Sequence, residues 1–110
     1  MFRNAFMVVA TTLCMASAWA IDCSAPKTKV QVLVCTDESL YDLDDKLHQA
    51  FTAAQSETRG VNGETGKVTD PVGYAQKQWT KNVLSKCSTA QCVRSSYAIR
   101  IRELEEITSR

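Results

Sequence analysis

The cysteines are the residues of this chain whose type and spacing most directly predict chemistry. Cys23, Cys35, Cys87 and Cys92 follow the first twenty residues, whereas Cys14 lies inside an apolar N-terminal stretch. Four thiolates can bind zinc, or they can pair as two disulfides. An exported chain meets oxidising conditions, which favour disulfides. Because the sequence has no CxxC pair for thiol exchange and no CxxCH for haem attachment, we expect no metal site and no cofactor.

The N-terminal stretch has the pattern of a secretory signal peptide. Arg3 supplies a positive charge, residues 6–13 are apolar, and residues 18–20 (AWA) form a small-x-small cleavage site. We expect cleavage after Ala20 and a periplasmic or secreted bacterial protein. The apolar run is shorter than the ~20 residues that span a bilayer, so no stable membrane insertion is expected after cleavage. Lipid attachment at Cys14 is a weaker alternative, because a bulky leucine precedes that cysteine.

Composition limits the kinds of partner. Removing residues 1–20 leaves 90 of the 110 residues. Arg3 is the only charged residue removed, so the 13 Lys and Arg residues fall to 12 and balance the 12 Asp and Glu residues. Nucleic-acid binding needs clustered, uncompensated cations, and we therefore expect no nucleic-acid partner. A chain of this length forms one small domain, in which disulfides compensate for a modest core.

Two helices are predicted in the first half of the mature chain. Thr28 followed by Gln31 is a capping box before a helix over residues 29–35, although this valine-rich run also suits a strand. A longer helix is expected to start at an Asp37 cap and to end before Gly60. Apolar residues recur along it at helical spacing: Leu40, Leu43, Leu47, Phe51 and Ala54.

Two further helices are predicted after a glycine-rich segment. Residues 60–73 show no apolar period and are expected to form a loop. Residues 74–86 are predicted to be helical, and Ser88 with Gln91 makes a capping box for a last helix. The expected apolar positions of these two helices are Ala75, Trp79, Val83, Val93, Tyr97, Ile101, Leu104 and Ile107. The fold class is therefore all-α, a small four-helix domain of helical hairpins over residues 21–110.

The predicted helices favour one disulfide pairing out of three. Cys87 and Cys92 flank the turn between the last two helices, so a bridge between them would clamp that corner. Cys23 and Cys35 bracket the first helix, and their bridge would tie down the N-terminal segment. We expect these two pairs, each stabilising the fold by about 2 to 3 kcal/mol.

A catalytic site is not supported by the residue pattern. His48 is the only histidine, and Asp44 lies one helical turn before it. This carboxylate could orient the imidazole as a base, but no nucleophile or oxyanion motif accompanies the pair. Asp42 and Asp45 point in other directions on the same helix and are expected to be solvated. We expect a non-enzymatic protein, with its aromatic residues in the core rather than on a stacking platform.

The order of motifs resembles the LprI-type lysozyme-inhibitor domain family, small exported helical domains of bacteria. The resemblance covers nearly the whole mature chain. Besides the four cysteines, it is carried by Leu43, Asp44, Gln76, Trp79, Tyr97 and Arg100, in the order L-D, Q-x-x-W and Y-x-x-R-I.

The resemblance implies a protein that binds and inhibits a muramidase. Lysozyme clefts hold two catalytic carboxylates, so the candidate partner-binding loop is the glycine-rich segment with Gly63, Glu64 and Lys67. The resemblance also suggests a structural ion pair between Asp44 and Arg100. The alternative is an envelope or stress protein that binds another protein and does not inhibit lysozyme.

Overall fold

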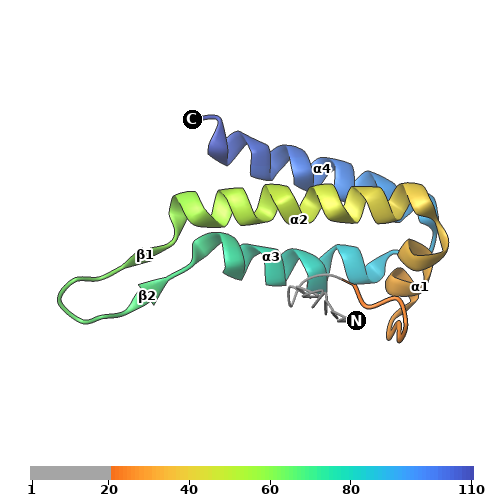
Figure 1. Cartoon of the computed structure of the whole chain (residues 1–110), viewed down its shortest axis with the longest axis horizontal. Coiled ribbons are helices and arrows are strands. Elements are labelled where there is room, and N and C mark those ends of the chain that lie inside the picture. The colour runs from red at the N-terminus through yellow and green to blue at the C-terminus, as the bar shows by residue number, and fades with distance from the viewer. Residues whose placement is uncertain (1–20) are drawn as a thin grey trace, which may run out of the picture.

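The computed structural model describes residues 21–110, and the predicted signal peptide lies outside them. The elements in chain order are α1 (Lys29–Thr36), α2 (Glu38–Thr58), β1 (Gly60–Val61), β2 (Val68–Thr69), α3 (Pro71–Asn82), a 3₁₀ turn η1 (Leu84–Lys86) and α4 (Ala90–Thr108). In Figure 1, α2 lies between α4 and α3, α1 lies at one end, and the β1–β2 hairpin projects from the other. The predicted all-α class is confirmed. No helix within 21–110 is both long and apolar enough to cross a membrane.

The caps expected for the first two helices are present. Thr28 Oγ1 accepts a hydrogen bond from the Gln31 amide at 3.1 Å, and the Gln31 side chain accepts from the Lys27 amide at 2.6 Å. Asp37 caps α2 by accepting from the amides of the next turn, and its other oxygen meets Arg94 of α4 at 3.4 Å. The helical prediction for the valine-rich run is therefore confirmed. The Thr28 cap accepts from a backbone N–H in the first turn of the helix that would otherwise have no partner.

The third helix starts earlier than predicted. Asp70 is its N-cap, and Pro71 occupies the first helical position, where a missing N–H costs nothing. Asp70 Oδ1 accepts from the Gly73 amide at 3.0 Å, and Oδ2 accepts from Gln55 of α2 at 2.8 Å. A β-carbon at residue 73 would collide with the Asp70 carboxylate, so this close cap requires glycine. The prediction of a single loop over residues 60–73 is therefore wrong at both ends. Residues 60–61 and 68–69 form β-strands, and residues 71–73 belong to α3.

Two other sequence expectations about the second half need correction. Thr89, not Ser88, caps α4, with its Oγ1 accepting from the Cys92 amide at 3.1 Å. On α3, Ala75 is exposed, whereas Val72 and Gln76 are buried, and Val83, just after the helix, is exposed as well. Because the helix starts at Pro71, its buried residues include Val72 and Gly73, which precede the predicted start, while Trp79 of the predicted face remains partly buried.

The core lies mainly between α2 and α4, which run alongside each other (Figure 1). Its largest fully buried side chains are Tyr97, Leu40, Leu104, Val34 and Val93. Trp79, Leu43 and Ile101 are partly buried against this core. The apolar stripes predicted on α2 and α4 are thus confirmed as the surfaces that join these helices.

Both predicted disulfides are formed. Cys23 pairs with Cys35 across a Cα–Cα distance of 5.5 Å, and Cys87 pairs with Cys92 across 5.4 Å. The first bridge holds the N-terminal segment against α1, and the second closes the corner between η1 and α4.

Replacing Cys23 and Cys35 together by serine should lower the free energy of unfolding by about 2 to 3 kcal/mol, because the unfolded chain regains the entropy of an open loop. Urea denaturation of the oxidised proteins, followed by circular dichroism, measures this change. The native helical signal should be preserved, since the α2–α4 core does not include this bridge. An unchanged unfolding midpoint would contradict the clamp role of this disulfide.

Candidate functional site

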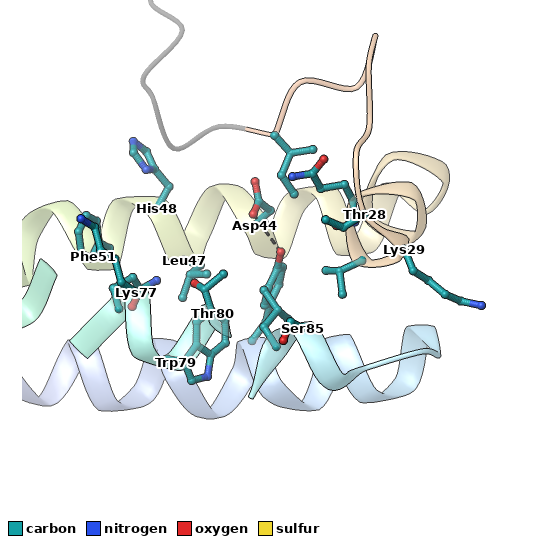
Figure 2. Close-up of a pocket in the computed structure, with 16 residues that line it drawn as sticks. Thr28, Lys29, Asp44, Leu47, His48, Phe51, Lys77, Trp79, Thr80 and Ser85 are labelled. Atoms are coloured by element: carbon teal, nitrogen blue, oxygen red, sulfur yellow. Dashed lines mark hydrogen bonds between the residues drawn. The ribbon is translucent and has the colours of Figure 1, made fainter. Parts of the chain in front are cut away.

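A cleft of about 410 Å³ opens between the N-terminal segment, α1, α2 and α3 (Figure 2), and Tyr97 of α4 also lines it. We call it the central cleft. Its apolar lining consists of Ile21, Val30, Leu47, Phe51, Trp79 and Leu84. Its polar lining includes Thr28, Lys29, Gln31, Asp44, His48, Gln76, Lys77, Thr80, Ser85 and Tyr97. A mostly apolar cavity of this size with a few polar groups has the features of a small-ligand site.

The most distinctive polar group of the central cleft is the Asp44 carboxylate. Tyr97 is only 1% exposed, and its hydroxyl donates a hydrogen bond to Asp44 Oδ1 at 3.0 Å (Figure 2). Burial raises the pKa of Asp44 above its usual value, while the Tyr97 hydrogen bond and the nearby His48 oppose that rise. Burial, with the Asp44 charge, also raises the pKa of Tyr97, so its hydroxyl stays protonated and acts as the donor.

Aromatic rings line the cleft beside this carboxylate. The ring centroids of Trp79 and Tyr97 are 6.1 Å apart, with the rings tilted by 37°. The two residues come from α3 and α4 and belong to the same core cluster, in which Tyr97 is buried and Trp79 is partly buried. Asp44, Gln76, Trp79 and Tyr97 therefore meet in one place, although they come from three helices that are separated in the sequence.

The predicted ion pair between Asp44 and Arg100 is wrong. Arg100 Nε donates to Gln76 Oε1 at 2.8 Å, and its Nη1 meets Glu103 at 3.1 Å. Tyr97, one turn before Arg100 on α4, takes the place of the arginine as the partner of Asp44. Arg100 instead joins α4 to α3, because its position on α4 turns it toward Gln76.

His48 does not form an oriented catalytic pair with Asp44. Both residues line the cleft, but within residues 21–110 the hydrogen bond that orients the carboxylate comes from Tyr97. Over the same residues, no group of three or more His, Cys, Asp or Glu side chains is arranged to hold a metal ion.

The predicted partner-binding loop is an ordered hairpin rather than an irregular loop. Its strands pair Gly60 with Thr69 and Val61 with Val68. The Asn62 side chain accepts from the amides of the next turn, at 2.8 Å from Glu64 and 3.0 Å from Thr65.

The hairpin tip is closed by backbone contacts and is fully accessible. The Asn62 amide donates to the Lys67 carbonyl at 2.8 Å, and Gly66 takes the positive φ of 73° that glycine tolerates. Gly63, Glu64 and Lys67 are all exposed. They lie at the projecting end of the molecule (Figure 1) and are not part of the central cleft.

Sequence reasoning missed several residues of the central cleft. Ile21 and Val30 reach it from the N-terminal segment and α1, and Leu84 reaches it from η1. No sequence period connects these positions. The start of α3 could have been predicted from Asp70 and Pro71, because an N-cap residue followed by proline is typical of a helix start.

Comparison of the chain with protein-family models, with curated proteins and with solved structures found no match.

Replacing Tyr97 with Phe should raise the pKa of Asp44 further, because it removes the hydrogen bond that stabilises the carboxylate in a buried setting. A pH titration of the side-chain carboxyl ¹³C shifts measures this pKa. Asp45, an exposed neighbour that accepts a hydrogen bond from Gln49 and not from Tyr97, serves as the internal control, and its carboxyl signal should be the same in both proteins. An Asp44 pKa that stays the same or falls would contradict the assigned hydrogen bond.

Asp44 should also give stability a distinctive pH dependence. Its folded pKa lies above the unfolded one, so the folded state binds this proton more tightly. Relative to Asp44→Asn, the wild-type protein should lose stability as the pH rises from about 4, the ordinary carboxyl pKa, through the raised folded pKa. Urea denaturation of both proteins across this range tests the sign. A wild-type protein that gains stability relative to the variant over this range would contradict the burial of Asp44.

Proposed function

We propose that this protein is an exported binding protein that inhibits a muramidase by inserting the β1–β2 hairpin into the enzyme's substrate cleft. The observation that carries the proposal is the shape of the hairpin, which projects beyond the ends of α2 and α3 (Figure 1). Two disulfides, which are compatible with an extracellular protein, support an exported setting.

The hairpin is suited to insertion because its tip is ordered before binding. The Asn62 side chain and the backbone bonds of Asn62 and Gly66 hold the turn, so little conformational freedom remains to be lost on association. An irregular loop of the same length would bind more weakly for that reason.

Lys67 supplies the chemistry that a muramidase cleft would recognise. Such clefts hold two carboxylates, and an exposed ammonium at a projecting tip can approach them without burying the rest of the domain. Glu64 lies on the same tip and has the opposite charge, so we assign the interaction to Lys67 itself and not to a general positive field.

Exposed apolar side chains also favour a protein partner. Val61 is 68% exposed, Val68 48% and Tyr74 68%, on the hairpin strands and the first turn of α3. These residues would rest on the rim of a partner's cleft while the tip enters it. They equally favour the second candidate, a protein that binds an envelope partner without inhibiting lysozyme.

Lys67→Glu should weaken inhibition by tenfold or more, on the order of the loss seen at an interface hot spot. The measurement is lysozyme-driven lysis of bacterial cell walls in the presence of purified, oxidised protein. Lys46→Glu is the matched control, because Lys46 is also an exposed lysine and lies on α2, outside the hairpin.

A second variant tests the hairpin as a whole. Replacing residues 62–67 with Asn-Gly keeps β1 and β2 joined by a tight turn and should abolish inhibition without changing the melting temperature by more than a few degrees. Inhibition that survives this replacement would refute the hairpin model. Absence of inhibition by the wild-type protein, together with binding to another envelope protein, would select the second candidate.

A further inference from the structure

The central cleft contains a carboxylate with unused bonding capacity. Asp44 Oδ1 accepts from the Tyr97 hydroxyl at 3.0 Å, and within the described residues the carboxylate has no second hydrogen bond and no salt bridge, although His48 lies near enough to act on its charge. Two oxygens of an ionised carboxylate can accept about four hydrogen bonds. A half-buried carboxylate with a single donor is therefore poorly satisfied, and a donor that enters the cleft would be stabilised there.

The walls around this carboxylate suit an apolar body. Leu47 and Phe51 of α2, Val30 of α1 and Leu84 of η1 line the cleft together with the ring of Trp79. The volume of about 410 Å³ lies in the range of small-molecule sites. The aromatic faces add a preference of their own, because a cation near an indole or phenol ring is attracted by the ring quadrupole.

The charged groups that face the cleft are distributed unevenly. α1 contributes Lys29, α2 contributes Asp44 and His48, and α3 contributes Lys77. In Figure 2, Lys29 extends away from Asp44 and out of the cleft, and His48 points away from the ring of Trp79. Lys29 and Lys77 are exposed, whereas Asp44 is partly buried beside the Tyr97 hydroxyl, so the least exposed of these formal charges is the negative one. An anionic ligand that filled the cleft would place its negative charge close to the Asp44 carboxylate, and the two charges would repel each other.

We propose that the central cleft binds a small organic cation, a primary ammonium group carried on an apolar and preferably aromatic body. The ammonium donates to Asp44 Oδ2, and the body packs between Trp79 and the apolar side chains of α1 and α2. Tyr97 positions the carboxylate from behind. This site is separate from the hairpin and does not depend on muramidase inhibition.

Three probes that share a phenyl ring, have similar size and differ in charge test the proposal. They are 2-phenylethylamine, 2-phenylethanol and 3-phenylpropionate, each titrated into the oxidised protein at neutral pH. Heteronuclear NMR follows the indole N–H of Trp79 and the methyl groups of Leu47, which line the cleft. We expect saturable shifts for the amine, binding at least about tenfold weaker for the alcohol, a difference of about 1.4 kcal/mol, and none for the carboxylate. Equal affinity for all three probes, or shifts confined to residues outside the cleft, would overturn the proposal.

A pair of variants tests whether amine binding depends on Asp44 itself or on the general negative charge of this part of α2. Asp44→Asn keeps an oxygen that accepts from Tyr97 but removes the charge, so the amine should bind no better than the alcohol. Asp45→Asn removes the same charge from the exposed neighbour and should leave amine binding within about twofold of wild type, because exposed charges are well screened. If Asp45→Asn weakens binding as much as Asp44→Asn, the site is a diffuse negative field and the proposal fails.

The wild-type probe series decides the matter even if Asp44→Asn does not fold. Lys67→Glu, the hairpin variant, should bind the amine as the wild-type protein does. Loss of amine binding in that variant would show that the cleft and the hairpin are not independent, which would also overturn the assignment.

Discussion

The packing of α4 along α2 is the interaction on which the rest of the structure depends. Tyr97 illustrates it, because this side chain is only 1% exposed and also carries the hydroxyl that meets Asp44 of α2. Leu104 and Leu40 are fully buried in the same interface. A large aromatic side chain whose polar end must find a partner fixes the relative position of two helices more closely than apolar contact alone.

The other elements are attached to this pair of helices by specific polar links. Asp70 caps α3 and accepts from Gln55 of α2, while Arg100 of α4 reaches Gln76 of α3. Asp37 caps α2 and meets Arg94 of α4. The central cleft lies beside Trp79, where α3 meets α2 and α1. The cleft is thus a consequence of how a third helix is added to a two-helix core.

The hairpin and the central cleft make different physical demands. A projecting tip binds by entering another molecule, so it needs exposure and an ordered turn, which Asn62 and Gly66 provide. A cleft binds by enclosing a ligand, so it needs apolar walls and one poorly satisfied polar group, which Asp44 provides. Since the two features occupy separate parts of the fold, a single small domain can accommodate both.

The sequence by itself determined the features that arise locally. Caps at Thr28 and Asp37, the apolar stripes of α2 and α4, and both disulfides follow from neighbouring residues, because caps, periodicity and short covalent loops act over a few turns of chain. The hydrogen-bond partner of Asp44, in contrast, could not be predicted from neighbouring residues. Only the tertiary structure decided between Tyr97 and Arg100, which lie one turn apart on α4, since a small rotation of that helix exchanges them. The cleft required the tertiary structure for the same reason, because its walls come from four separate helices.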